Sequence, residues 1–141
     1  MNVFDILGPV MIGPSSSHTA GAARIGRITL ALLGAPAVKA DIFLHGSFAK
    51  TYKGHGTDKA LIAGIMGMST DDSRIRRAPE LAREQGLAVT ITTGDIDGAH
   101  PNTARVALTD ADGNRVSLLG SSIGGGNILV TEVNGMEVSI T

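Results

Sequence analysis

The hydrophobic positions near the start of the chain follow the spacing of an α-helix. Within residues 18–33, Ile25, Ile28 and Leu32 recur at intervals of three and four residues, which places them on one helical face. Gly34 follows directly, and glycine commonly ends helices. The pattern therefore predicts a helix over 18–33 with Ile25, Ile28 and Leu32 as its apolar face.

Two glycines lie inside this predicted helix. Gly21 and Gly26 each cost about 1 kcal/mol relative to alanine, because glycine loses more backbone freedom on entering a helix. Such a cost needs compensation. We expect a neighbouring backbone to pack closely against the two positions.

The next segments predict a strand, a loop and a second helix. Residues 38–45 have the composition of a strand, and residues 45–58 are glycine-rich and polar, which indicates a loop with at most a turn of helix. The second helix is expected through Met66, and either Thr57 or Asp58 is expected to cap its N-terminus.

A third helical stretch is predicted over residues 71–85. Pro79 lies inside it, so the pattern predicts either one kinked helix or two short helices that meet there. The stretch also carries Arg74, Arg76 and Arg77, which we interpret as a solvated face or an interface and not as catalytic residues.

After residue 86 the pattern changes to short strands. They are predicted over 87–93, 104–109, 115–119, 128–133 and a last half-buried strand with Met136, Val138 and Ile140 alternating. Residues 110–114 connect one hairpin, and Asn134-Gly135 is a strong hairpin signal for another. The GSSIGGG stretch at 120–126 fits either a β-bulge or a surface that approaches another backbone closely.

The order of these elements indicates the fold class. A helix, a strand, further helices and then several strands predict an α+β domain over 1–141, with helices packed on one face of a largely antiparallel mixed sheet. With 43% hydrophobic and 18% charged residues, the chain is globular in composition.

Charge and cysteine content exclude several kinds of function. A formal net charge of −1 argues against a nucleic-acid partner, and no apolar run approaches the roughly 18 residues that cross a membrane. No signal-peptide pattern is present at the start, so we expect a cytoplasmic protein. The chain has no cysteine, which excludes disulfides, a thiol nucleophile and an iron–sulfur cluster held by thiolates of this chain.

The most unusual polar stretch is GPSSSHTAGAAR at 13–24. It places Ser15, Ser16, Ser17, His18 and Thr19 at the start of the first predicted helix. One helix cap needs one hydroxyl, so the surplus suggests a helix N-terminus that is presented to a small anionic ligand. A redundant cap in a serine-rich loop is the alternative, and the residues alone leave both open.

The histidines supply a second candidate group. His55 lies between two glycines and is followed by Thr57 and Asp58; imidazole titrates near neutral pH and suits proton abstraction. A loop histidine that orders the glycine-rich turn is an equally good interpretation of His55. In HPNT, His100 precedes a proline, and a turn closed by a side-chain bond of Asn102 or Thr103 is the favoured interpretation.

Four stretches together resemble the β chain of bacterial iron–sulfur L-serine dehydratases (L-serine ammonia-lyases). The similarity spans nearly the whole chain in the same order, which makes it far more specific than any single motif. The stretches are GPSSSHTAGAAR at 13–24, HGSFAKTYKGHGTDKA at 45–60, HPNT at 100–103 and SIGGG at 122–126.

The resemblance implies a reaction and a division of labour. The family converts L-serine to pyruvate and ammonia with a four-iron, four-sulfur cluster and without pyridoxal phosphate. Cysteines of a partner α chain hold the cluster, so this chain, which has no ligand for it, would form the opposite wall of the active site in an oligomer and be inactive alone. The family also implies a fold similar to the allosteric substrate-binding domain of D-3-phosphoglycerate dehydrogenase.

The resemblance further implies roles for individual residues. His55 matches the family's candidate base for the Cα proton, and a second set would bind the serine carboxylate and amine: Ser15, Ser16, Ser17, His18 and Thr57. Supporting positions are expected at Thr19, Asp58, His100 and Asn102. Two-chain family members usually continue into a C-terminal ACT domain, which we expect to be missing after Thr141. A non-catalytic domain that binds a small anion or amino acid is the main alternative, whereas a serine hydrolase is disfavoured because no GxSxG elbow is present.

Overall fold

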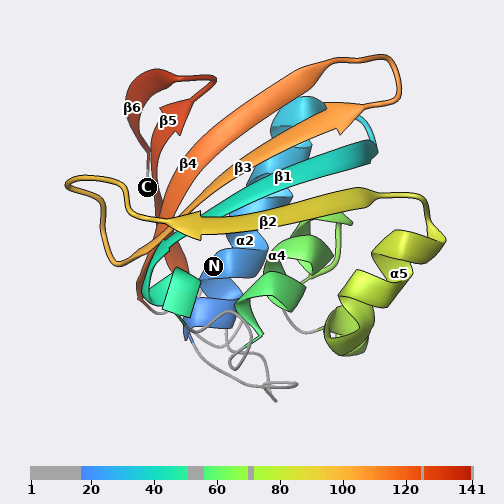
Figure 1. The fold of residues 1–141 in the computed structure, drawn as a ribbon, viewed down its shortest axis with the longest axis horizontal. Helices are drawn as coiled ribbons and strands as arrows, with labels where there is room; N and C mark the ends of the chain where they lie inside the picture. The colour runs from blue at the N-terminus through green and yellow to red at the C-terminus, as the bar shows by residue number, and fades with distance from the viewer. Residues whose placement is uncertain (1–16, 51–55, 70–71, 125, 141) are drawn as a thin grey trace.

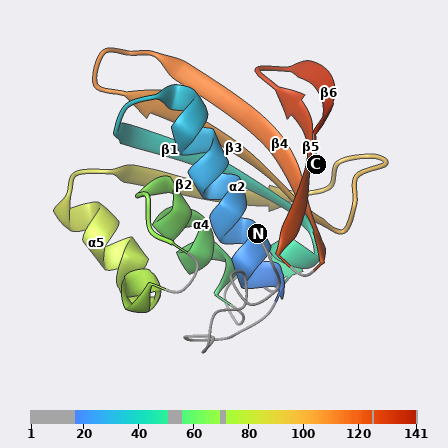
Figure 2. The same ribbon diagram turned by 180° about the vertical axis from the view of Figure 1, so that it is seen from behind.

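The computed structural model describes residues 17–50, 56–69, 72–124 and 126–140. Figures 1 and 2 show a twisted sheet with its helices gathered on one face. In chain order the elements are α2 (Ser17–Leu33), β1 (Ala37–Gly46), α4 (Thr57–Ile65), the 3₁₀-helix η1 (Ser73–Arg77), α5 (Ala78–Glu84), β2 (Ala88–Gly94), β3 (Asn102–Asp110), β4 (Arg115–Gly124), β5 (Asn127–Val133) and β6 (Met136–Ile140).

The sheet is mixed and mostly antiparallel. Its strand order is β2-β1-β3-β4-β5-β6; β1 and β2 are parallel, joined through α4, η1 and α5, and the other neighbours are antiparallel. Alternate residues of each strand face the helices, as Ala40, Ile42 and Leu44 do in β1. The predicted α+β class, with helices on one face of the sheet, is confirmed.

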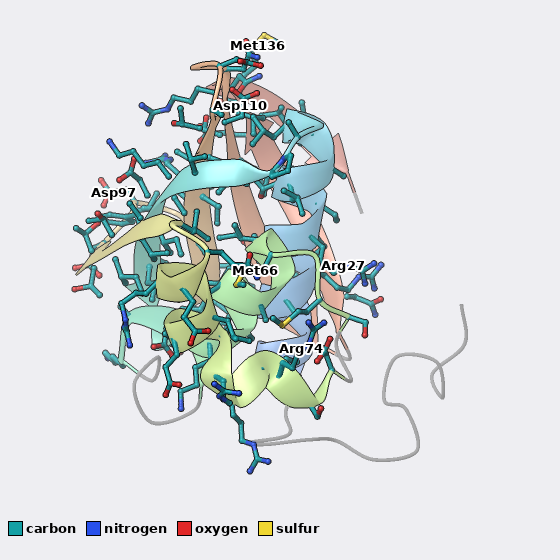
Figure 3. All side chains as sticks on the ribbon, turned by 90° about the vertical axis from the view of Figure 1, so that its right-hand side faces the viewer. Arg27, Met66, Arg74, Asp97, Asp110 and Met136 are labelled. Atoms are coloured by element: carbon teal, nitrogen blue, oxygen red, sulfur yellow. The ribbon has the colours of Figure 1, made fainter. Side chains whose placement is uncertain are left out.

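The strand directions bring many segment ends to one edge of the sheet. β1, β2 and β4 end at this edge, and β3 and β5 begin there. α2 leads into β1 at the opposite edge, and α4 follows β1 in the chain, so both helices begin at the same edge where β1 ends (Figure 2). We call it the motif edge, because residues 45–50, 56–60, 100–103 and 122–124 meet there. In Figure 3, Asp110 and Met136 mark the opposite edge.

α2 and α4 lie side by side and run in the same direction, in backbone contact at two glycines. An added methyl group at Gly26 would lie 2.5 Å from the Leu61 carbonyl oxygen, and one at Gly64 would overlap the Ala23 carbonyl oxygen. Further along both helices, Gly67 approaches Leu30. The expectation that a backbone packs against Gly26 is therefore confirmed, and α4 provides that backbone.

Ser122 of β4 packs against the other helical glycine. A methyl group at Gly21 would overlap the Ser122 side chain. The GSSIGGG stretch thus makes a close approach, and the register of β4 against β5 also shifts between Ser122 and Gly124. Both interpretations of this stretch hold, since it is a strand end that carries a bulge.

Three predictions for the first helices and the last strand are wrong in detail. Leu32 is 50% exposed, and the buried face of α2 consists instead of small residues and Ile25 because α4 approaches so closely. Thr57 and Asp58 do not cap α4: its N-cap is Gly56, with φ 76° and no side-chain cap. Met136 is 68% exposed, so the last strand is not half-buried at that position.

The stretch around Pro79 forms two short helices. η1 begins after Asp72, whose carboxylate accepts a hydrogen bond from the Arg74 backbone N–H at 2.8 Å. The guanidinium of Arg74, labelled in Figure 3, also donates to Asp72 at 2.7 Å and lowers the pKa of that carboxyl group. α5 then starts with Pro79 in its first turn, where proline fits because its missing N–H has no helical partner.

A substitution of Gly64 tests the contact between the two helices. Gly64→Ala should lower the free energy of unfolding by about 2–3 kcal/mol, because the methyl group would push against backbone that cannot rotate away. In a helix without such a neighbour the same change would stabilise by about 1 kcal/mol. Urea unfolding followed by circular dichroism measures the difference.

Gly34→Ala is the matched control for this prediction. Gly34 has φ 76° and open space around it, so only backbone strain of about 1 kcal/mol is expected. A Gly64→Ala protein as stable as the wild type would contradict the backbone contact.

Candidate functional site

The motif edge brings together the sequence stretches that carry the candidate chemistry. α2 continues directly from the serine cluster, and α4 begins two residues after His55. Because the two helices are parallel, their positive ends point to the same edge, and the N–H groups of each first turn, which have no partner within the helix, add to the field. Such an arrangement favours a negatively charged ligand.

The start of α2 is tied to the loop between β4 and β5. Arg24 donates a hydrogen bond from Nη1 to the Gly126 carbonyl oxygen at 3.2 Å. Together with the contact between Gly21 and Ser122, this bond holds Ser122 and Gly126 against the first two turns of the helix. The half-buried Arg24 also adds positive charge to this end of α2.

Thr57, the first residue of α4, carries an unpaired buried hydroxyl. The residue is 0% exposed, and no hydrogen-bond partner of its Oγ1 is found in the part of the chain that the structure describes. A buried hydroxyl without a partner costs about 1–3 kcal/mol, so native proteins rarely keep one without a functional reason. Thr57 Oγ1 is therefore available to a ligand at the start of α4.

The HPNT stretch is a turn, as expected, but it also contributes to the motif edge. The His100 Nδ1 accepts a hydrogen bond from the Asn102 backbone N–H at 3.0 Å, and the Pro101 carbonyl oxygen accepts one from the Ser47 N–H at 2.7 Å. Thr103 closes the turn by donating to the His100 carbonyl oxygen at 2.6 Å. The side-chain Oδ1 of Asn102 is buried and finds no donor among the described residues.

The side chain of His100 lies on the other face of the sheet from the helices, although its Nδ1 accepts the bond from Asn102. His100 is exposed and lines a hollow of about 510 Å³ on the sheet face that the helices leave open, together with Ser121 and Glu132. Asp97 of the same loop and Arg27 of α2 lie on opposite sides of the molecule in Figure 3. The supporting position expected for His100 is therefore not next to Thr57.

The remaining predicted site residues are placed as follows. Ser15, Ser16 and His55 lie outside the described residues. Ser17 and His18 belong to the first turn of α2, and the half-buried Thr19 follows them. Asp58 is half-buried in the first turn of α4.

Sequence reasoning alone did not identify Ser122 and Arg24 as parts of this edge. The signal for Ser122 was the pairing of Gly21 with a glycine-rich strand end, which allows two backbones to approach closely. Arg24 closes the motif that contains the serines, but only the fold shows that it bonds to residue 126.

The donor atoms of this chain do not fit an iron–sulfur cluster. The chain has no cysteine, and its described residues contain no group of three or more histidine, aspartate or glutamate side chains that could hold a metal ion. Among the described helices, none is long and apolar enough to span a bilayer.

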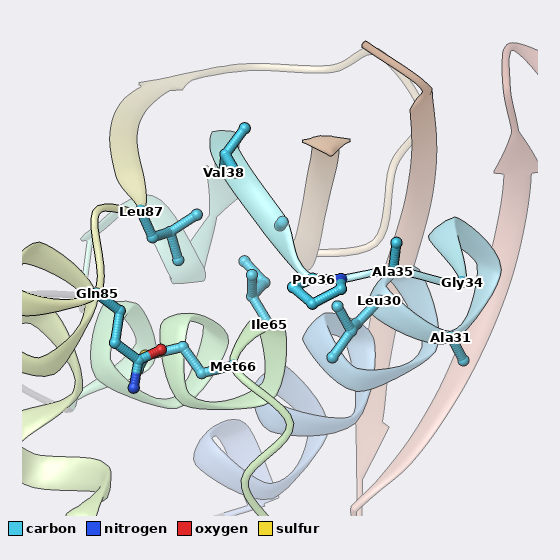
Figure 4. Close-up of a pocket in the computed structure, with 11 residues that line it drawn as sticks. Leu30, Ala31, Gly34, Ala35, Pro36, Val38, Ile65, Met66, Gln85 and Leu87 are labelled. Atoms are coloured by element: carbon cyan, nitrogen blue, oxygen red, sulfur yellow. The ribbon is translucent and has the colours of Figure 1, made fainter. Parts of the chain in front are cut away.

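An apolar hollow lies at the far ends of the helices. It has a volume of about 480 Å³ between the end of α2, the end of α4 and the start of β1. Figure 4 shows Leu30, Ile65 and Leu87 around it. None of its lining residues is ionisable, so it offers no acid–base chemistry.

Comparison with known proteins gives consistent similarities. A family model described as serine dehydratase beta chain matches residues 2–97. The chain is 49% identical to the probable L-serine dehydratase beta chain of Bacillus subtilis (strain 168), over 99% of this chain and 63% of that protein. It is 42% identical to the L-serine dehydratase beta chain of Peptoniphilus asaccharolyticus, over 97% of this chain and 62% of that protein.

A more distant similarity extends to a longer protein. The L-serine dehydratase of Mycobacterium tuberculosis (strain CDC 1551 / Oshkosh) is 31% identical over 96% of this chain and 34% of its own length. The chain thus spans a little less than two thirds of the two β chains and about a third of this longer relative.

The unpaired Thr57 hydroxyl leads to a prediction about stability. Thr57→Val keeps the shape of the side chain and removes the buried polar atom, so the free energy of unfolding should rise by about 1 kcal/mol. Thr103→Val is the matched control, because Thr103 is 1% exposed but bonds to the His100 carbonyl oxygen and to Ser121 Oγ at 2.7 Å. The free energy of unfolding of Thr103→Val should fall by about 1–2 kcal/mol in the same urea titration. Equal losses in the two variants would mean that Thr57 Oγ1 has a hydrogen-bond partner.

Proposed function

The chain belongs to the serine dehydratase beta chain family, and on this premise we propose that it is the β subunit of an enzyme that converts L-serine to pyruvate and ammonia. The observation that carries the proposal is the pair of parallel helices that start at one edge, together with the unpaired buried hydroxyl of Thr57 at the start of α4. This geometry suits a small carboxylate, which L-serine provides.

The carboxylate of L-serine is assigned to the two helix starts. N–H groups of the first turns of α2 and α4 donate to its oxygens, as they do to anions at other helix N-termini. Thr57 Oγ1 donates a further bond, which satisfies the buried hydroxyl. Ser17 and His18 lie in the first turn of α2, where a carboxylate would reach them.

His55 is assigned as the base that removes the Cα proton. It stands two residues before Thr57 in the sequence, so a carboxylate held at the start of α4 brings Cα close to this segment. The Cα–H electrons form the Cα–Cβ double bond, and the β-hydroxyl leaves as water after taking up a proton. The product, 2-aminoacrylate, tautomerises to an imine, and one water hydrolyses it to pyruvate and ammonia.

A partner α chain is proposed to complete the site. The cysteine-free chain cannot supply thiolate ligands, so the four-iron, four-sulfur cluster that the family implies is assigned to the partner. When bound there, the cluster supplies a Lewis acid that helps the β-hydroxyl to leave. This chain binds and orients the substrate and accepts its Cα proton.

The assignment of His55 predicts a loss of turnover. This chain is co-expressed with the cysteine-bearing α chain, the complex is reconstituted anaerobically with iron and sulfide, and pyruvate formation from L-serine is followed. His55→Asn should lower kcat by about 10²–10⁴-fold, the range for removal of a general base. His45→Asn is the control, because His45 lies on the open sheet face and accepts a bond from the Ile96 N–H at 2.8 Å; its kcat should stay within about threefold.

Two outcomes would contradict these assignments. Wild-type turnover in His55→Asn would remove His55 as the base. Full pyruvate formation by the α chain without this chain would refute the β-subunit proposal as a whole and favour a separate ligand-binding role.

A further inference from the structure

Asn102 presents a buried hydrogen-bond acceptor that no described residue satisfies. Its Oδ1 is shielded from solvent, and the only other such buried side-chain atom among the described residues is Thr57 Oγ1. Both atoms belong to segments at the motif edge, one at the start of β3 and the other at the start of α4. Because buried polar atoms without partners are rare, two of them at the same edge point to one shared ligand.

The strand register places Asn102 on the helix-covered face of the sheet. Thr103 bonds to Ser121 on the open face, so its neighbour Asn102 lies on the opposite face, with Ala104. Continuing the β3–β4 register by one residue beyond the pair of Thr103 and Ser121 would put Asn102 opposite Ser122. Ser122 in turn touches Gly21 of α2, so Asn102 lies below the first two turns of that helix.

Thr57 lies at about the same height along the pair of helices as Gly21, which touches Ser122. Thr57 stands seven residues before Gly64, which corresponds to about 10 Å along the axis of α4. Gly21 stands five residues before Gly26, or about 7.5 Å along α2, and the two helices are parallel and touch at Gly26 and Gly64. A ligand at the start of α4 is therefore flanked by Thr57 and by the sheet edge that carries Asn102.

The two orphan atoms have different chemistry. A hydroxyl can donate to a carboxylate, whereas the amide oxygen of Asn102 only accepts and needs an N–H or O–H donor. The ammonium group of an amino acid is such a donor, and it is repelled by the positive helix ends and by Arg24. It is therefore directed away from the helices, toward the sheet.

We propose that Asn102 binds the α-ammonium group of the substrate through Oδ1, while the helix starts and Thr57 hold the carboxylate. The inference rests on the proposed function and adds to it the residue that selects amino acids over other carboxylates. The amide carbonyl oxygen accepts a hydrogen bond from the protonated ammonium group and is too weak a base to remove its proton.

The test compares two ligands that differ only in the ammonium group. L-Alanine and propionate share the carboxylate and the methyl group, and neither has a β-hydroxyl to eliminate. Their dissociation constants are measured by calorimetry on the complex with the α chain. Asn102→Leu should weaken L-alanine about ten- to hundredfold, the effect of losing a hydrogen bond to a charged group, and should change propionate by less than about twofold.

Thr57→Val provides the crossed control. It removes a contact to the carboxylate, which both ligands have, so it should weaken L-alanine and propionate by the same factor. Equal weakening of both ligands by Asn102→Leu, or no weakening of either, would overturn the proposal.

Asn102→Asp is a second variant for the case that Asn102→Leu does not fold. It keeps the shape of the side chain and the acceptor oxygen. It should bind L-alanine at least as well as the wild type and bind propionate more weakly, through repulsion between carboxylates. Loss of L-alanine binding as large as that of propionate would mean that the amide nitrogen faces the ligand, and the proposal would be wrong.

Turnover of L-serine separates this inference from the proposed function. If the wild-type complex forms pyruvate but its Asn102 variants discriminate the two ligands as the wild type does, only the inference falls. A wild-type complex that neither forms pyruvate nor binds L-alanine refutes both.

Discussion

The backbone contact between α2 and α4 is the constraint on which the candidate site depends. Gly26 and Gly64 let the two helices approach until backbone atoms touch, and they run in the same direction. Any larger residue at either position would separate the helices or tilt them. Because both helices start at the edge where β1 ends, the contact aligns two positive helix ends, and the anion-binding character of the edge follows from the packing.

This arrangement gathers several features that lower the stability of the fold at one edge of the molecule. Two helix ends of like charge lie side by side, α4 has no side-chain cap, and Thr57 and Asn102 keep buried polar atoms without described partners. The interactions that stabilise the fold lie away from that edge. They come from the apolar layer between the helices and the sheet, which includes Ile25, Ile42 and Leu61. A bound ligand with a carboxylate and an ammonium group would reduce each of these unfavourable contributions, which supports the proposal of an amino-acid site.

The sequence predicted what local patterns encode. Helix 18–33 and the turn at Asn134-Gly135, where Asn134 takes φ 52°, follow from periodicity and turn chemistry, and both are confirmed. The exposed Leu32 was misassigned because periodicity assumes that a helix packs with its largest residues, whereas α2 meets α4 through glycine and alanine. The orphan at Asn102 was equally invisible, since it depends on strand register and on residues more than forty positions away.

The resemblance identified which residue types matter, and the fold explains how they divide the work. In the proposed site, Thr57 and the serine cluster, which lead into helices in the sequence, would meet a ligand from the positive side, whereas Asn102 lies on a strand, where backbone N–H groups are already paired. A helix end selects negative charge and cannot by itself distinguish an amino acid from any other small carboxylate. That distinction needs an acceptor set apart from the helix field, and the first residue of β3 is the described position that offers one. In the proposed site, recognition of a zwitterion would thus follow from joining helix starts and a strand start at one edge.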